Sequence, residues 1–172
     1  MIDDVKQVAQ QIADEITQIE RRERKRNSEA QMHFEYAIAS IVQEVWKGTY
    51  ILPELELSIN KNANWYSQFP RYRDPNLTYK QATAAYNGML ALGLIEETKS
   101  GYLDREKGIG ELTKYVAHDK LLEMLKAISD NPFKVIKPDL DAECIILRDR
   151  IDGVRTIVNY EDTPQTIKMR EN

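Results

Sequence analysis

The stretch from Leu77 to Val116 constrains the fold of this chain more than any other part of the sequence. Thr78 is a good N-cap residue, and Gln81 three positions later completes a capping box, so a helix is expected to begin here. Apolar residues then recur at helical spacing, namely Ala82, Ala85 or Tyr86, Met89 and Leu92. Gly93 stands where helices commonly end in a left-handed residue, so the pattern predicts a helix over 78–92.

The residues after Gly93 predict a hairpin with a charged tip. Three short strands are expected: one that starts at Leu94, one from Tyr102 to Asp104, and one from Leu112 to Val116. A predicted turn at Ser100-Gly101 separates the first two strands, and a glycine-bearing loop, Arg105 to Gly110, separates the last two. A capped helix followed by a hairpin with a basic tip is typical of the second half of a winged helix-turn-helix. In that architecture the helix enters the DNA major groove and the hairpin, or wing, touches the neighbouring backbone.

The residues before this stretch supply the first half of such a domain. Ser28 is the predicted N-cap of a helix that runs to about Lys47 and stops at Gly48, with apolar residues on one side: Phe34, Ala37, Ile38, Ile41, Val42 and Val45. Leu55, Leu57 and Ile59 alternate with polar residues, which predicts a half-buried strand. We expect a polar turn and a short second helix over 60–67 and a proline-bearing loop over 69–76.

The N-terminal residues 1–26 predict an amphipathic helix. Its apolar stripe consists of Ile2, Val5, Val8 or Ala9, Ile12, Ile16 and Ile19. The stripe could dock on the domain that follows or pair with a second copy of the chain as a short coiled coil. A basic cluster ends this region, and it suits either phosphate contacts or a solvated helix end: Arg21, Arg22, Arg24, Lys25 and Arg26.

The C-terminal part predicts a helix and then a β-hairpin. Asp119 is the expected cap of a helix through Lys126, and a connector containing Pro138 follows over 134–141. Cys144 to Arg148 and Val154 to Val158 flank Asp152-Gly153, which is a strong hairpin signal. Both strands are apolar on both faces, so the hairpin is expected to pack on the domain, another subunit or a partner. A helix start at Thr163-Pro164 suggests that the chain belongs to a longer protein or orders on a partner.

These patterns give an α+β fold class, a winged helix-turn-helix with an N-terminal helical extension and a C-terminal β-hairpin. We expect an amphipathic helix over 1–27, the winged-helix domain over 28–129, and the connector, hairpin and helix start over 130–172.

The predicted helix over 78–92 carries side chains that suit base recognition on the face opposite its apolar stripe. Asn87 can bond adenine bidentately, Thr83 can touch the thymine methyl, and Lys80 can reach guanine or phosphate, with Tyr79 beside them. Cations flank this helix on both sides. Those expected to hold DNA backbone are Arg71 and Arg73 ahead of the helix and Lys99, Arg105 and Lys107 at the wing.

Several short stretches between about residues 33 and 128 resemble the winged-helix domain of plasmid and phage replication initiators. The stretches are Asn60-Lys61-Asn62, Trp65-Tyr66-Ser67, Arg71-Tyr72-Arg73, Leu77-Thr78-Tyr79, Leu92-Gly93-Leu94-Ile95-Glu96, Gly101-Tyr102, Asp104-Arg105-Glu106, Gly108-Ile109-Gly110, Thr113-Lys114, Ala117 and Lys120-Leu121-Leu122. The resemblance implies binding of duplex DNA at an origin or operator through helix and wing.

Composition and missing motifs narrow the remaining classes. The net charge of -4 counts against a protein coated in positive charge, although a local basic face remains compatible with it because charges are screened over about 8–10 Å. The lone Cys144 excludes an intrachain disulfide, and His33 and His118 lie far apart in the sequence. The sequence contains no phosphate loop or zinc-helix motif, and we predict neither enzyme activity nor a cofactor. We see no signal peptide or apolar membrane span, which indicates a cytoplasmic protein.

Two functional classes remain open. The first is sequence-specific binding of double-stranded DNA, in replication initiation or transcription regulation. The second is a winged-helix module for protein interaction without DNA binding, which the acidic net charge favours. A homodimer through the N-terminal helix or the C-terminal hairpin is expected as a further partner.

Overall fold

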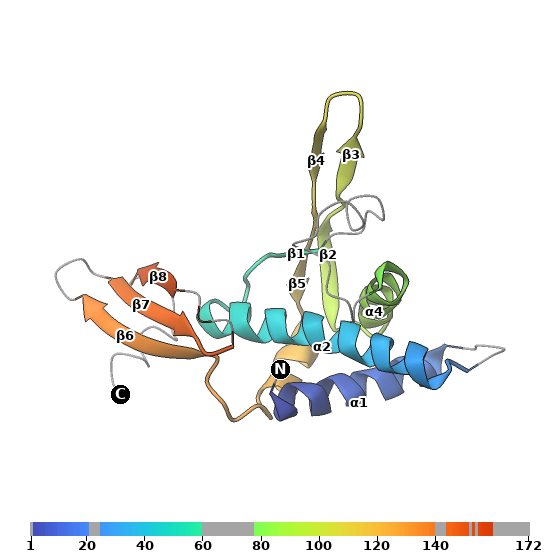
Figure 1. Cartoon of the computed structure of the whole chain (residues 1–172), viewed down its shortest axis with the longest axis horizontal. Helices are drawn as coiled ribbons and strands as arrows, with labels where there is room; N and C mark the ends of the chain where they lie inside the picture. Colours follow the sequence, from blue (N-terminus) through green and yellow to red (C-terminus); the bar gives the residue numbers. More distant parts are fainter. Residues whose placement is uncertain are drawn as a thin grey trace.

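The chain has a mixed α+β architecture in the computed structural model, which describes residues 2–20, 25–59, 78–139, 144–151, 153 and 155–159. The elements are α1 (Asp3–Ile19), α2 (Ser28–Ile51), β1 (Leu57–Ile59), α4 (Tyr79–Ala91), β2 (Ile95–Lys99), β3 (Tyr102–Asp104), β4 (Ile109–Glu111), β5 (Thr113–Ala117), α5 (Asp119–Leu125), β6 (Phe133–Asp139), β7 (Cys144–Asp149) and β8 (Arg155–Asn159). Figure 1 shows α1 and α2 below an upright hairpin, α4 beside the base of that hairpin, and a separate small sheet beside one end of α2.

Within these ranges, every helix is too short or too polar to cross a membrane.

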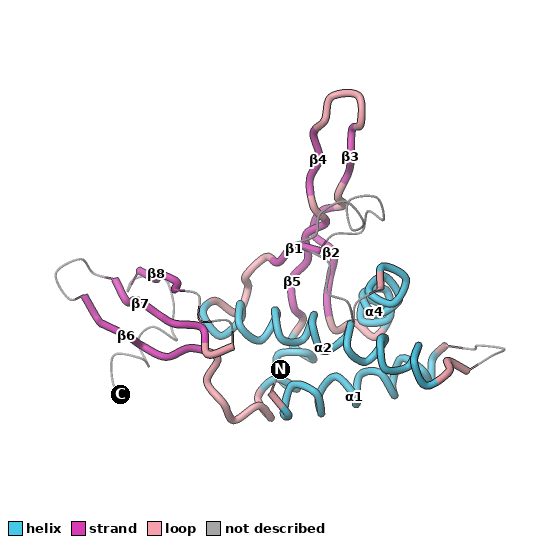
Figure 2. The backbone as a smooth tube through the Cα atoms, in the orientation of Figure 1, coloured by secondary structure: helices cyan, strands magenta, loops and turns pink. Residues whose placement is uncertain are grey.

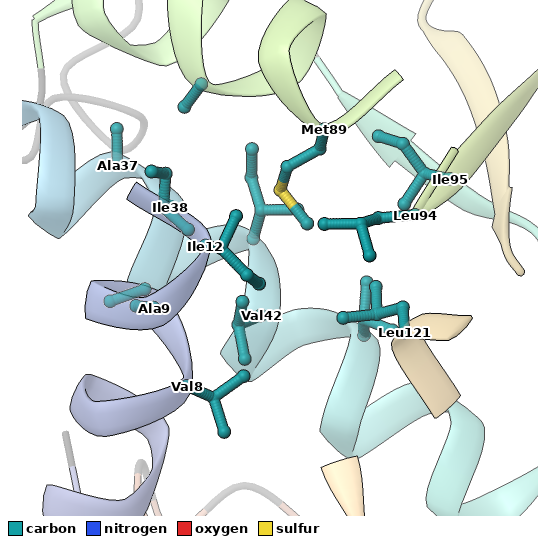
Figure 3. Packing of buried hydrophobic residues seen from close by; sticks show 14 of the residues in the cluster. Val8, Ala9, Ile12, Ala37, Ile38, Val42, Met89, Leu94, Ile95 and Leu121 are labelled. Atoms are coloured by element: carbon teal, nitrogen blue, oxygen red, sulfur yellow. The ribbon is translucent and has the colours of Figure 1, made fainter. Parts of the chain in front are cut away.

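The helices α1, α2 and α4 share one hydrophobic core. The predicted stripe of α1 is buried in it at Val5, Val8, Ala9, Ile12 and Ile16. Figure 3 shows Val8 and Ile12 directed towards Ile38 and Val42 of α2, with Met89 of α4 close by. Of the two expected uses of the stripe, the structure has the first: it docks on the domain of its own chain. At the two ends of the stripe, Ile2 is partly buried and Ile19 is 51% exposed.

Arg26 differs from what the basic cluster predicts, because it neither reaches phosphate nor lies in solvent. Its side chain is 3% exposed, and its guanidinium pairs with the Glu20 carboxylate at 3.0 Å. The same guanidinium lies over the Phe34 ring, 3.6 Å from the centroid. Arg26 thus links Glu20, the C-cap of α1, to Phe34 of α2. Lys25 is exposed, whereas Arg21, Arg22 and Arg24 lie outside the described residues.

Both predicted ends of α2 were wrong. The N-cap is Asn27, one residue earlier than Ser28, because its side chain accepts the Ala30 N–H at 2.8 Å. Gly48 lies inside the helix, which continues to Ile51. A Cβ at Gly48 would lie 2.9 Å from Leu55 Cδ2, so the absence of a side chain at Gly48 lets Leu55 pack directly on the helix.

The predicted strand at Leu55–Ile59 is confirmed as the shorter strand β1. It joins an antiparallel sheet in the order β1-β5-β2, with Leu57 opposite Tyr115. The strands β2 and β5 of this sheet form the base of a hairpin, which continues beyond the sheet as the antiparallel pair β3-β4. Figure 2 shows the β2-β5 pair and the β3-β4 pair following one another along a single projecting ribbon.

The helix α5 begins one residue earlier than expected. His118 is its N-cap and has no side-chain cap bond, and the predicted cap Asp119 is the first helical residue. The reason is a strand contact, because the His118 N–H donates to the Leu94 carbonyl at 3.0 Å and keeps His118 extended. Leu121, Leu125 and Ile128 are buried in the core, and Leu122 packs against it partly buried.

The predicted connector over 134–141 was wrong, because most of it is strand β6. It forms a sheet in the order β6-β7-β8, in which Pro138 lies opposite Ile145. Proline is tolerated there because β6 is at the edge of the sheet, where a missing N–H breaks no ladder. The predicted hairpin of β7 and β8 is confirmed, and Gly153 at its turn has φ +74. Thr163-Pro164 lies outside the described residues.

A buried ion pair ties this C-terminal sheet to α2. Lys47 Nζ lies 2.9 Å from Asp149 Oδ2, with side chains 14% and 6% exposed. Asp149 Oδ1 also accepts the Ile151 N–H at 2.7 Å. The rings of Tyr50 and Phe133 meet beside it with centroids 6.1 Å apart. The hairpin therefore packs, at least in part, on the domain of its own chain.

We predict that Lys47→Met destabilises the chain by about 3 kcal/mol, because it removes the cation of a buried ion pair with Asp149. The double variant Lys47→Met/Asp149→Asn should recover much of this loss, since Asn keeps an acceptor for Ile151 and carries no charge. Urea unfolding measures both. Lys6→Met is the matched control, because Lys6 forms an exposed pair with Asp3 and its loss should cost under about 0.5 kcal/mol. Equal losses in the single and double variants would contradict a charge effect.

Candidate nucleic-acid interface

The helix α4 has the ends that the sequence predicts. Thr78 Oγ1 accepts the Gln81 N–H at 3.2 Å and caps the first turn. At the other end Gly93 has φ +68, its N–H donates to the Leu90 carbonyl, and the Leu94 N–H donates to the Met89 carbonyl, both at 3.0 Å. This pair of bonds is a Schellman motif. It turns the chain directly from α4 into β2.

The inner face of α4 packs on α1 and α2. Ala82, Ala85, Tyr86 and Met89 are buried, as the apolar stripe predicts. Gly88 is buried as well, and a Cβ there would lie 2.7 Å from Ile16 Cδ1 of α1. The backbone of α4 therefore lies directly on an α1 side chain.

The outer face of α4 displays the residues predicted to read bases. Lys80 and Asn87 are exposed, and Tyr79 and Thr83 are half exposed. Lys80, Thr83 and Asn87 are spaced three and four residues apart, so they lie along one side of the helix. No aspartate or glutamate occurs between Tyr79 and Ala91, whereas the whole chain has 28 such residues in 172. The outer face of α4 is thus free of negative side chains of its own.

Ser100-Gly101, which the sequence predicts as a turn, does not reverse the chain. It interrupts one arm of the hairpin, between β2, which pairs with β5, and β3, which pairs with β4. The Gly101 N–H donates to Thr113 Oγ1 at 3.0 Å. A Cβ at Gly101 would lie 2.6 Å from the Glu111 carbonyl oxygen, so the two arms approach too closely here for any other residue.

The chain reverses at the tip of the hairpin, between β3 and β4. Asp104 Oδ1 accepts the N–H groups of Glu106 and Lys107, each at 3.1 Å, and Gly108 has φ +64. Arg105 and Lys107 are exposed at this tip, as predicted. Figure 1 shows the tip standing well clear of the helices, on the same side of α2 as α4.

Lys99, a predicted DNA contact, is engaged within the hairpin. Its ammonium pairs with the Glu111 carboxylate on the opposite arm. The hydrogen bond to Glu111 raises the pKa of Lys99. Both side chains are exposed, so this pair exchanges readily with other charges.

A hydrogen-bonded group joins α4 to the hairpin. The Tyr86 hydroxyl of α4 donates to Glu97 Oε2 of β2 at 2.8 Å, and Ser100 Oγ donates to Glu97 Oε1 at 2.7 Å. The Tyr86 ring meets Tyr115 of β5 edge to face, with centroids 5.6 Å apart. Burial and the Glu97 carboxylate raise the pKa of Tyr86, and burial raises that of Tyr115.

The other two predicted DNA contacts, Arg71 and Arg73 ahead of α4, lie outside the described residues. Tyr102 and Ile109 on the hairpin were missed, although they are 51% and 50% exposed. The sequence placed Tyr102 in a predicted strand next to the charged tip, but it placed Ile109 in the predicted loop, whereas Ile109 begins strand β4.

The search for metal-binding groups among the described residues and the comparisons with known proteins both gave no match. The described ranges contain no group of three or more histidine, cysteine or acidic side chains that could hold a metal ion. No protein-family model matches the chain, and comparison with characterised proteins and with solved structures gave no match either.

We predict that stability falls as the pH rises above about 10, the ordinary tyrosine pKa, because Tyr86 and Tyr115 hold their protons more tightly when folded. Their contribution is complete below that pH and is lost as they ionise. Tyr86→Phe should cost about 1 kcal/mol at neutral pH and flatten the alkaline loss. Urea unfolding at a series of pH values measures both.

Tyr102→Phe removes an exposed hydroxyl and is the control, which should leave stability at neutral pH unchanged. An alkaline loss as steep in Tyr86→Phe as in the wild type would contradict the role given to Tyr86.

Proposed function

We propose that this chain binds double-stranded DNA through a winged helix, with α4 in the major groove and the hairpin of β2 to β5 as the wing on the neighbouring backbone. The observation that carries the proposal is the exposed outer face of α4, which bears Lys80 and Asn87 and lacks carboxylates, next to a projecting hairpin with cations at its tip. Duplex DNA is a polyanion, so a helix face without carboxylates approaches it with less electrostatic repulsion.

The order of the elements supports a winged helix. A first helix α2 leads to β1, then α4 precedes a hairpin, and the strand β5 lies between β1 and β2. The short second helix that the sequence predicts within 60–67 falls between β1 and α4, and it lies outside the described residues. This is the order in which winged helix-turn-helix domains place their first helix, recognition helix and wing.

The distribution of charge supports binding despite the net charge of -4. At the wing tip the Asp104 carboxylate is turned onto backbone N–H groups, and Glu111 is paired with Lys99. Arg105 is exposed and makes no ion pair in the part of the chain that the structure describes. In the described wing tip Arg105 is thus the one cation outside an ion pair, and it lies beside the exposed carboxylate of Glu106 and the Lys107–Asp104 pair.

The biological role we favour is replication initiation of a plasmid or phage type, with transcription regulation as the variant that uses the same contacts. Support for it comes from the resemblance of the stretches around α4 and the wing to initiator domains. We propose no enzyme activity for this chain.

A protein-interaction module is the second candidate, and the acidic net charge is the observation that favours it. Its expected docking surfaces were the α1 stripe and the C-terminal hairpin. The stripe is buried in the core, which removes the larger of these surfaces.

We predict that the chain binds a fluorescently labelled duplex of mixed sequence at low salt and releases it as salt rises. Arg105→Ala and Lys107→Ala should each reduce the slope of log affinity against log salt by about 1, because each removes one phosphate contact. Fluorescence anisotropy measures the slope. Lys126→Ala is the matched control: Lys126 and Lys107 are 72% and 74% exposed, and each pairs with an acidic residue three positions before it.

Absence of binding by the wild type at low salt would reject DNA binding and favour the protein-interaction module. Binding with an unchanged slope in both wing variants would reject the placement of the wing on DNA.

We predict that Lys80→Ala and Asn87→Ala weaken a selected site by about 1–3 kcal/mol and random DNA much less, because these residues lie on the outer face of α4. The site is obtained first by selection from a random duplex pool with the wild type. Gln10→Ala, which truncates an exposed amide on α1, is the control and should leave both affinities unchanged. Equal losses on selected and random DNA would contradict base contacts by α4.

A further inference from the structure

An open cavity lies between the C-terminal half of α2, the helix α5 and the turn that follows α5, and the proposed function gives it no role. Its volume is about 450 Å³. Ligand pockets in proteins commonly measure about 300–1,000 Å³. A water molecule in the liquid takes about 30 Å³, so the cavity has room for about 15 non-hydrogen atoms, enough for a two-ring aromatic compound.

The walls of the cavity are aromatic and aliphatic. Trp46 and Tyr50 of α2 line it, together with Leu122, Leu125 and Ile128 from α5 and the turn after it. Trp46 is 5% exposed, and Leu125 and Ile128 are 7% exposed, so the packing of the core holds these walls in place. Aromatic side chains bind flat rings well, by offset stacking or by edge-to-face contact. The lining therefore suits a flat apolar ligand.

The two hydroxyl groups that α2 contributes to the lining differ. Thr49 Oγ1 donates to the Val45 carbonyl at 2.6 Å and is satisfied within the helix. The Tyr50 hydroxyl has no hydrogen-bond partner among the residues that the structure describes. Burial raises the pKa of Tyr50, so its hydroxyl keeps its proton at neutral pH and can donate it to an acceptor. A ligand with one acceptor atom would satisfy this group.

The charges around the cavity balance one another. Lys126 at its mouth is paired with Glu123 at 2.6 Å. Asp130, also at the mouth, and Arg150, whose charge acts on Tyr50, add one charge of each sign. A charged ligand would lose hydration on entering this apolar space and would find no net opposite charge to replace it. The surroundings of the cavity therefore favour a neutral ligand.

We propose that this cavity binds a neutral aromatic compound of one or two rings that carries a hydrogen-bond acceptor for the Tyr50 hydroxyl. The rings lie against Trp46 and the aliphatic side chains of α5, and an oxygen or nitrogen atom of the ligand accepts the Tyr50 O–H. This inference is independent of DNA binding, since none of the described residues that line the cavity belongs to α4 or to the hairpin.

The test is a titration of the isotope-labelled full chain with 2-naphthol, followed by NMR. This probe is neutral, has two rings and carries a hydroxyl oxygen that can accept from Tyr50. The readout is the indole N–H signal of Trp46, which is assigned by its loss in Trp46→Phe. We expect a saturable shift of this signal with a dissociation constant below about 1 mM, which is attainable for a ligand of this size.

Two variants locate the ligand. Tyr50→Phe should weaken binding of 2-naphthol about 2–10-fold, because one hydrogen bond is lost. Tyr102→Phe is the control, since it removes an exposed hydroxyl on the wing and should leave binding unchanged. Leu122→Trp should weaken binding at least about tenfold, because the larger ring occupies space that the ligand needs. Its matched control is Leu90→Trp, at a leucine of α4 that also packs partly buried against the core.

Two charged analogues test the chemical class of the ligand. The anion 2-naphthoate and the cation 2-naphthylmethylammonium should each bind at least about fivefold more weakly than 2-naphthol. Circular dichroism verifies that every variant is folded, and Tyr50→Phe, which removes a hydroxyl without a partner, keeps the test decisive if Leu122→Trp does not fold.

Each result supports or overturns the inference. Absence of a saturable shift in the wild type would overturn it, and so would wild-type affinity in Tyr50→Phe or in folded Leu122→Trp. Tighter binding of either charged analogue would overturn the assignment of a neutral ligand. None of these results would touch the proposal of DNA binding, which anisotropy measures separately.

Discussion

The close contact between Gly88 of α4 and Ile16 of α1 is the constraint on which the exposed surface of the molecule depends. A Cβ at Gly88 would lie 2.7 Å from Ile16 Cδ1, so only glycine lets the two helices approach this far. Because α1 also packs along α2, it forms one wall of the core and is more than an appendage to the domain. The contact fixes which face of α4 is turned inward, and therefore which side chains it displays.

Short-range contacts fix the position of the hairpin relative to α4. The Schellman motif at Gly93 leads straight into Leu94, which is fully buried. The hydrogen bond from Tyr86 to Glu97 and the edge contact of Tyr86 with Tyr115 hold the first and last strands of the wing against the helix. Helix and wing are thus joined as one unit. Such preorganisation lowers the entropy that binding must offset, whichever partner the unit takes.

The parts of the fold that depend on neighbours in sequence could be predicted, and the parts that depend on distant neighbours could not. Thr78 and Gly93 were assigned correctly because a cap and a left-handed stop are local. Gly48 has the same chemistry as Gly93 but a different role, set by Leu55 seven residues away. The strand at Pro138 was missed because only its pairing with β7 makes it a strand.

The exposed face of α4 followed from its helical period, whereas the exposure of Tyr102 and Ile109 depends on how far the hairpin projects from the core.

The described part of the proposed DNA-binding surface offers few cations, which limits how it could recognise DNA. Counterion release gives a slope of about -0.9 per neutralised phosphate, so Lys80, Arg105 and Lys107 together would account for a slope of about -3. A protein with so few phosphate contacts binds random DNA weakly at physiological salt. Under the proposed function, discrimination would then come mainly from contacts between α4 and base edges, which carry little charge. Lys80 is the only charged residue between Tyr79 and Ala91, so the composition of α4 suits recognition of this kind.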